Sequence, residues 1–283
     1  MTARQVINLL EDSALANRSH PQRNGAMLHL PGVGELIVVG DLHNHQRNFE
    51  RIQKYAALGK HPKRYVILQE LIHGGPLGNQ GQDTSFDMLI ATLRWARDFP
   101  GRVHFLMANH DLAQVQQAPV MKDGYNLTQR FNQHLELLYG NSAVEVGAAL
   151  KNFVFSQALA AITVTGLFLA HSLPGPKDIA TFDPGFFSRP LTDADFVRPG
   201  SAYCLIWGRH QTAEILQKLS KAWWADVFVC GHQQQDDGYA AVEPNLLIVD
   251  SSHNQGVMLH LDLAKAYSLA SLRGAVVPLA GLG

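Results

Sequence analysis

Six short apolar runs, rich in β-branched residues, recur along the chain and limit the folds open to it. The runs are LIVV (36–39), YVIL (65–68), VHFLM (103–107), LFLA (167–170), VFVC (227–230) and LLIV (246–249). Their length and composition predict buried β-strands. Stretches with apolar residues at helical spacing lie between several of them, at 48–58, 86–99 and 213–224. Strands that alternate with helices predict an α/β fold.

The size of the chain suits one large domain. It has 283 residues, 46% of them hydrophobic and 17% charged, which is ample for a buried core. Because no repeat, low-complexity tract or long linker marks a boundary, we expect a single domain over residues 1–283. Residues 177–201 are rich in Pro, Asp and Phe without clear periodicity. We expect a surface excursion there, of the kind that often shapes a substrate mouth.

Charge and targeting signals narrow the possible partners. The 23 Lys and Arg against 24 Asp and Glu leave a formal net charge of −1, so no global field favours a nucleic-acid polymer or an anionic membrane. The first residues lack the basic start and apolar run of a signal peptide, and no run approaches the roughly 20 apolar residues of a membrane span. Cys204 and Cys230 are the only cysteines, and Cys230 lies in an apolar run, which favours a reduced buried thiol. We expect a cytoplasmic location.

The residues that follow five of the apolar runs carry the functional signal. They are Asp41 and His43, Glu70, Asn109 and His110, His171, and His232. Each has an ordinary alternative role, such as capping a helix, closing a turn or packing in the core. In an open α/β sheet, however, the C-terminal strand ends share one edge, so these side chains are expected to converge. Oxygen and imidazole donors without Cys suit a divalent ion such as Mn, Fe or Zn.

The order of these motifs resembles that of the calcineurin-like metallophosphoesterases, and most closely their serine/threonine phosphoprotein phosphatase branch. The matching segments are GDLHN (40–44), QELIHGG (69–75), ANHD (108–111), AHSLP (170–174), LIWGR (205–209) and GHQQQDDGY (231–239). The resemblance spans roughly residues 36–260, which we take as the core of the domain. It implies a metallophosphoesterase fold, with two packed mixed β-sheets flanked by helices in four layers.

The resemblance also implies a centre of two divalent ions. By position, the implied ligands are Asp41 and His43 for the first ion, Glu70 as a bridge, and Asn109, His171 and His232 for the second. Two such ions, about 3.5–4 Å apart, bind the phosphoryl group and lower the pKa of a water that attacks phosphorus in line. His110 would stay unligated and protonate the leaving oxygen, a role that suits an imidazole near pH 7.

The second block departs from the family pattern, which is Gly-Asp-x-x-Asp-Arg-Gly where this chain has QELIHGG. Glu70 keeps the carboxylate with one more methylene. His73 replaces an aspartate that would orient the catalytic His, and Gly74 replaces an arginine that would hold phosphate. Arg209 is a candidate to replace that arginine with a bidentate contact, although a surface salt bridge is the alternative.

Four further residues are candidates for the site. Asp111 directly follows His110 and could orient its ring. His45, His73 and His253 are candidates for substrate contacts around the mouth, although an imidazole near a metal site can equally support the ligands or be solvated.

These observations predict a metal-dependent phosphoric-ester hydrolase, a phosphomonoesterase acting on a phosphorylated protein or small molecule. Two alternatives stay open. The same site could hydrolyse a nucleotide polyphosphate or a phosphodiester. The altered block at 69–75 could instead mark a member that binds metal or phosphate without catalysis. The sequence does not indicate an oligomeric state.

Overall fold

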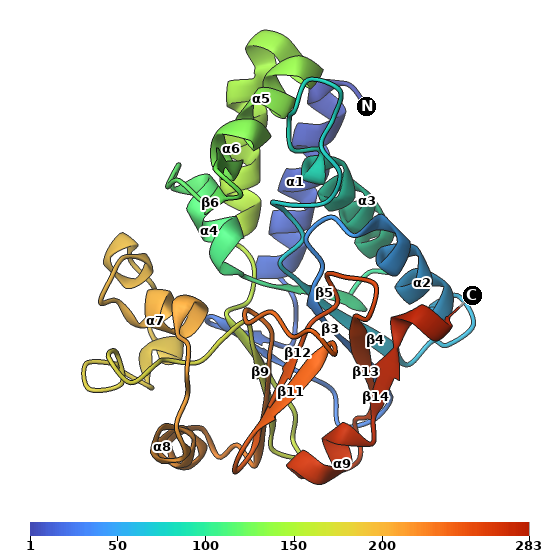
Figure 1. Ribbon diagram of the computed structural model, residues 1–283. Coiled ribbons are helices and arrows are strands. Elements are labelled where there is room, and N and C mark those ends of the chain that lie inside the picture. The colour runs from blue at the N-terminus through green and yellow to red at the C-terminus, as the bar shows by residue number, and fades with distance from the viewer. Residues whose placement is uncertain (283) are drawn as a thin grey trace.

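The computed structural model describes residues 1–282 as two β-sheets packed face to face, with helices beside them (Figure 1). The larger sheet has the strand order β1 (Arg23–Asn24), β2 (Met27–His29), β8 (Ala160–Ile162), β9 (Leu167–Ala170), β10 (Val227–Cys230), β12 (Leu246–Val249) and β11 (Tyr239–Val242). The smaller sheet has the order β14 (Val276–Pro278), β13 (Val257–Asp262), β3 (Glu35–Asp41), β4 (Arg64–Gln69) and β5 (Val103–Leu106). A separate hairpin joins β6 (Met121–Lys122) to β7 (Tyr125–Asn126).

The helices are α1 (Ala3–Arg18), α2 (Gln46–Ala56), α3 (Ser85–Asp98), α4 (Asn109–Val115), α5 (Leu127–Tyr139), α6 (Ala143–Val154), α7 (Ser201–Trp207), α8 (Ala213–Trp223) and α9 (Leu269–Arg273). In Figure 1, α2 and α3 lie beside the smaller sheet and α7 and α8 beside the larger one. Helices α1, α5 and α6 gather at the end that carries the N-terminus. None of the described helices is long and apolar enough to cross a membrane.

Alternate residues of each central strand face two different cores, as the pleat of a strand requires. In β9, Leu167 and Leu169 belong to the cluster between the sheets, which also holds residues of β3 and β12. Phe168, between them, points the other way and stacks on Trp223 of α8 with ring centroids 4.4 Å apart. Because both faces are buried, the strands read as continuous apolar runs. All six runs that predicted strands are strands, so the predicted α/β fold with two mixed sheets is confirmed.

The segment at 177–201 is irregular, as predicted, with two short 3₁₀ turns at Phe186–Ser188 and Asp193–Phe196. Its aromatic residues Phe182 and Phe187 pack against Trp223, with ring centroids 5.9 and 5.7 Å away. No described residue of this segment lines the cavity at the strand ends. The apolar side chains of the segment hold it against α8, so it does not form a wall of this cavity.

The two sheets meet where their parallel strands end. Strands β3, β4 and β5 run parallel in one sheet, and β9, β10 and β12 run parallel in the other. Asp41 of β3 pairs with Asp250, just after β12, in an isolated parallel bridge between the sheets. Gly40 permits this approach, because a Cβ there would lie 2.1 Å from the carbonyl oxygen of Val249. The functional strand ends of both sheets are thereby brought to one edge.

Candidate metal centre

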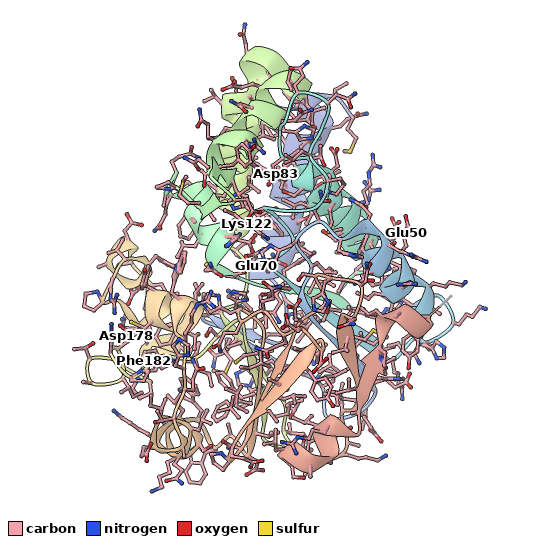
Figure 2. The ribbon with its side chains drawn as sticks, in the orientation of Figure 1. Glu50, Glu70, Asp83, Lys122, Asp178 and Phe182 are labelled. Carbon is pink, nitrogen blue, oxygen red and sulfur yellow. The ribbon has the colours of Figure 1, made fainter. Side chains whose placement is uncertain are left out.

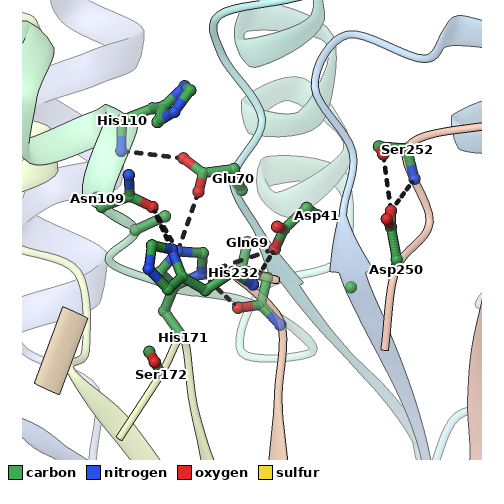
Figure 3. A network of polar contacts seen from close by, with 12 residues as sticks. Asp41, Gln69, Glu70, Asn109, His110, His171, Ser172, His232, Asp250 and Ser252 are labelled. Atoms are coloured by element: carbon green, nitrogen blue, oxygen red, sulfur yellow. Dashed lines mark hydrogen bonds and ion pairs between the residues drawn. The ribbon is translucent and has the colours of Figure 1, made fainter. Parts of the chain in front are cut away.

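The predicted ligands converge on one cavity of about 490 Å³ at this edge (Figure 3). The candidate ligands that line it are Asp41, His43, Glu70, Asn109 and His232, and His110 joins them. The sixth candidate ligand, His171, is fully covered, and its ring contacts the others from below the cavity surface. These side chains come from the ends of β3, β4, β5, β9 and β10 or from the turns after them, as the alternation of strands and polar residues predicted.

Glu70 lies at the middle of this group. Its Oε2 is 2.9 Å from Nε2 of His171, and its Oε1 accepts a hydrogen bond from the backbone N–H of His110 at 3.0 Å. The side-chain oxygen of Asn109 lies 2.8 Å from both Nε2 of His171 and Nδ1 of His232. Asp41 accepts a hydrogen bond from the backbone N–H of His232 at 3.0 Å. Oxygen and nitrogen donors therefore face one another across a small volume.

The donor atoms fit two neighbouring divalent ions. Ligand atoms of Glu70, His171 and His232 all lie within 4.8 Å of one another, and so do those of His43, Glu70 and His110. Glu70 belongs to both groups, as a bridging ligand would. Nε2 of His232 is buried without a hydrogen-bond partner among the described residues, which a metal ion would satisfy. Because His110 belongs to the group with His43 and Glu70, its unligated state stays a prediction.

The carboxylate and imidazole charges in the site depend on one another. Burial alone would lower the pKa of His171, but the nearby Glu70 carboxylate outweighs it and raises that pKa above its usual value. Burial would likewise raise the pKa of Glu70, but the ring of His171, which donates a hydrogen bond to it, holds that pKa well below its usual value. Burial raises the pKa of Asp41 to about 6. The Glu70 carboxylate and the protonated form of the His171 ring thus stabilise each other.

Three candidate ligands have a strained backbone. The φ angles of His43, Glu70 and His232 are 43°, 47° and 67°, in the left-handed region that non-glycine residues rarely adopt. Each such conformation destabilises the folded state by on the order of 1–3 kcal/mol, and strained residues of this kind cluster at functional sites. The surrounding close contacts hold these turns in place, which aims three side chains at one point.

Asp111 does not orient the ring of His110. Its Oδ2 accepts a hydrogen bond from the backbone N–H of Ala108 at 3.3 Å and so caps α4. Burial raises the pKa of this carboxyl group to about 8. The ring of His110 instead lies against His43 and His73, with centroids 4.9 and 5.3 Å away. The expected role of Asp111 is wrong because successive residues at a helix start point in different directions.

His73 does not contact substrate space, which corrects a second expectation. Its side chain is fully buried, outside the lining of the cavity, with Nε2 2.8 Å from Oε1 of Gln114. Because the Gln114 amide donates from its nitrogen to Asn132, its oxygen must accept, so His73 carries its proton on Nε2. Its neutral ring packs beside His110, at the position where the family pattern has an aspartate.

His45, His253 and Arg209 do line the cavity. Nδ1 of His45 accepts from the backbone N–H of Asn48 at the start of α2, at 3.2 Å. Both ring nitrogens of His253 bond the backbone, at the carbonyl of residue 235 and the N–H of residue 255, at 2.8 and 3.2 Å. His253 therefore shapes the rim but has no nitrogen left for a substrate hydrogen bond. Arg209 is exposed and forms no ion pair or side-chain hydrogen bond with a described residue.

The backbone explains why no arginine follows His73. Gly74 has φ 155°, and a Cβ there would lie 2.8 Å from the carbonyl oxygen of His43. The two turns pack so closely that a side chain at Gly74 has no room. The position of Arg209, in contrast, is tied to the site, because the hydroxyl of Ser172 donates to the carbonyl oxygen of Gly208 at 2.5 Å.

Sequence reasoning missed several residues of the site. The side-chain oxygen of Gln69 accepts a hydrogen bond from Nδ1 of His171 at 2.8 Å, and the position of Gln69 directly before Glu70 was the signal available. Asp250 also lines the cavity, and its position directly after the apolar run at 246–249 was the same signal that marked the predicted ligands. Lys122 and Ser252 line the cavity without any sequence motif that marks them. Asp250 holds its own loop through bonds of 2.8 and 2.7 Å from the N–H and hydroxyl of Ser252 (Figure 3).

The sequence model described as calcineurin-like phosphoesterase matches residues 35–243. The chain belongs to this family. Its members are metal-dependent phosphoesterases with a centre of two metal ions, so a phosphoester substrate is implied, and the donor groups around Glu70 fit such a centre. No curated protein matches the chain in sequence.

Solved structures carry the same fold at low identity. A protein serine/threonine phosphatase from Saccharomyces cerevisiae, described as similar to human phosphatase PP5, matches with a TM-score of 0.68 and 13% identity, over 99% of this chain and 94% of that one. A cold-active protein-tyrosine phosphatase from a psychrophilic Shewanella species matches with a TM-score of 0.61 and 15% identity, over 88% and 80% of the two chains. These likenesses confirm the metallophosphoesterase fold alone.

Proposed function

We propose that the chain is a phosphomonoesterase whose centre holds two divalent ions, with Mn, Fe or Zn as candidates. The observation that carries the proposal is the position of Glu70, which shares ligand-atom clusters with His43 on one side and with His171 and His232 on the other. When bound, two such ions supply a nucleophilic water and neutralise charge on the phosphoryl oxygens. Asp41 and Asn109 complete the ligand set as proposed from the family resemblance.

The proposed acid is His110. Its ring lines the cavity beside Glu70, and in the metal-free site burial lowers its pKa to about 3, so the ring is neutral at pH 7. A dianionic phosphoryl group beside the ring favours its protonated form. His110 therefore takes up a proton together with the substrate and delivers it to the leaving oxygen. His73 packs against this ring and keeps it facing the cavity.

Arg209 is the proposed contact for the outer phosphoryl oxygens. It lines the cavity, and its charge contributes to the lowered pKa of His232, after burial and His171. Its guanidinium has no carboxylate partner among the described residues, so it is free to bind an anion with two parallel hydrogen bonds. This contact replaces the arginine for which Gly74 leaves no room.

A substrate screen tests the proposal. Purified protein reconstituted with Mn²⁺ is assayed against phenyl phosphate, bis(4-nitrophenyl) phosphate and a dinucleoside polyphosphate. We expect the highest kcat/KM for the monoester, because Arg209 and the metal ions together suit a dianionic group. Preference for the diester or the polyphosphate would support the alternative hydrolase. Tight metal binding without turnover of any of the three would support a non-catalytic member.

A further inference from the structure

A second free cation lines the cavity. Lys122 and Arg209 are the two Lys or Arg residues that line it within the part of the chain that the structure describes. Neither forms an ion pair or side-chain hydrogen bond with a described residue. Lys122 and Glu70 both line this cavity, and in Figure 2 Lys122 lies near Glu70 on the side of the helical end of the molecule. The proposed function assigns no role to Lys122.

A hairpin of defined register presents this lysine. Lys122 of β6 pairs with Tyr125 of β7, across a turn formed by Asp123 and Gly124. The φ angles of these turn residues are 52° and 80°, as a tight hairpin turn of the Asp-Gly type requires. The guanidinium of Arg130 in α5 lies 3.4 Å from the centre of the Tyr125 ring and holds the hairpin to the helix. The lysine is thus carried by an anchored element.

Lys122 lies at the rim of the cavity and not at its floor. Its side chain is exposed, whereas Glu70 and Asn109 are 1% and 2% exposed. The reacting phosphoryl group belongs beside these buried ligands. Arg209 is exposed as well, but its neighbour Gly208 is hydrogen-bonded to Ser172, directly after His171, so Arg209 is held beside the ligands. Lys122 stands on the separate β6–β7 hairpin and is therefore placed to meet a part of the substrate beyond the phosphorus atom, which is its leaving group. An ammonium group is a compact charge that suits a single phosphate or carboxylate.

We infer that Lys122 binds a second anionic group, carried on the leaving group of the substrate. The inference rests on the proposed function and names its substrate class, which is a phosphomonoester with a further phosphate or carboxylate. Asp250 also lines the cavity but is 2% exposed, and its oxygens face inward to accept hydrogen bonds from Ser252 and from the backbone of Gln235. The buried carboxylates Asp41 and Glu70 serve as metal ligands.

Matched aryl phosphates test the inference. The wild type and Lys122→Met are assayed on phenyl phosphate and on 4-carboxyphenyl phosphate, which differ in one anionic group on the leaving group. The measured quantity is the ratio of the two kcat/KM values, so the intrinsic reactivity of each ester cancels between the proteins. We expect Lys122→Met to lower the preference for the carboxylated ester by about 2–5-fold, the usual worth of an exposed charge pair. A third ester, 1,4-phenylene bisphosphate, shows whether phosphate or carboxylate is the preferred second group.

The controls separate this inference from the proposed function. Lys221→Met removes an exposed lysine of α8 outside the cavity and should leave the ratio unchanged. Metal content and thermal unfolding of Lys122→Met should match the wild type, because the side chain is exposed. An unchanged ratio, or an equal loss on both esters, overturns the inference while the proposed function stands. Absence of wild-type turnover on phenyl phosphate would instead reject the proposed function.

Discussion

The side chain of Gln69 holds the ring of His171 in one orientation, with Oε1 2.8 Å from Nδ1. The amide nitrogen of Gln69 donates to the carbonyl oxygen of Val39 at 3.1 Å, so the amide oxygen must accept. His171 therefore carries a proton on Nδ1, and its Nε2 faces Glu70 and Asn109. Gly231 makes room for this contact, because a Cβ there would lie 3.1 Å from the Gln69 amide.

Loss of this contact should weaken metal binding. Gln69→Leu should lower the Mn²⁺ affinity of one of the two sites by about 10–100-fold, because His171 loses the acceptor that fixes its tautomer. Gln69→Glu keeps an acceptor and should retain most of the affinity. Titration calorimetry measures both, with the exposed Gln129→Leu in α5 as control. Equal affinity in wild type and Gln69→Leu would show that the hydrogen bond has no such role.

Metal binding should release protons. In the metal-free site the Glu70 carboxylate raises the pKa of His171 and so favours its protonated ring, whereas a metal ligand must be deprotonated. Mn²⁺ uptake should therefore be accompanied by proton release. The number of protons released should rise as the pH falls toward 6, because the Asp41 carboxyl is then also partly protonated. The apparent affinity for Mn²⁺ should therefore fall as the pH falls. Calorimetry in buffers of different ionisation enthalpy counts the protons, and no release at pH 7 would contradict the assigned charges.

If His110 is the acid and not a metal ligand, its replacement should lower catalysis without changing metal binding. His110→Asn should keep the wild-type metal content and lower kcat on phenyl phosphate by about 10²–10⁴-fold. The loss should be smaller on 4-nitrophenyl phosphate, because that leaving group departs without protonation. A loss of one metal ion per chain, measured by elemental analysis, would make His110 a ligand, as its place beside His43 and Glu70 also permits.

Arg209 should contribute to substrate binding and turnover through its forked guanidinium. Arg209→Lys keeps the charge and should lose part of kcat/KM. Arg209→Ala should lose more, and its loss should correspond to more than the ~1 kcal/mol of an exposed ion pair. Inorganic phosphate should inhibit Arg209→Ala more weakly at unchanged metal content. The matched control is Arg4→Ala, an exposed arginine of α1. Wild-type kinetics in both Arg209 variants would leave this residue without a role in the site.

The sequence predicted most of the fold because the strands are buried on both faces. In β9 and β10 every residue is apolar, and the polar residue that follows each run marks the strand end. Since parallel strand ends share an edge, the convergence of His171 and His232 could be inferred without coordinates. The same reasoning placed Asp41 and Glu70 in the site.

Side-chain direction within a turn could not be inferred in this way. Asp111 and His73 adjoin functional positions in sequence, yet one caps a helix and the other is buried behind His110. Lys122 lies about 50 residues from Glu70 in the chain and enters the cavity only because its hairpin packs on α5. Such placements depend on tertiary contacts that leave no local pattern.

The number of metal ions per active chain tests the account most directly. Protein stripped of metal and titrated with Mn²⁺ should reach two ions per chain by elemental analysis, with phenyl phosphate hydrolysis appearing as the second ion binds. Asn109→Ala and His232→Ala should each retain one ion and lose hydrolysis, because both residues lie on the same side of Glu70. Full hydrolysis by metal-free protein, or saturation of the wild type at one ion, would contradict a two-ion centre built around Glu70.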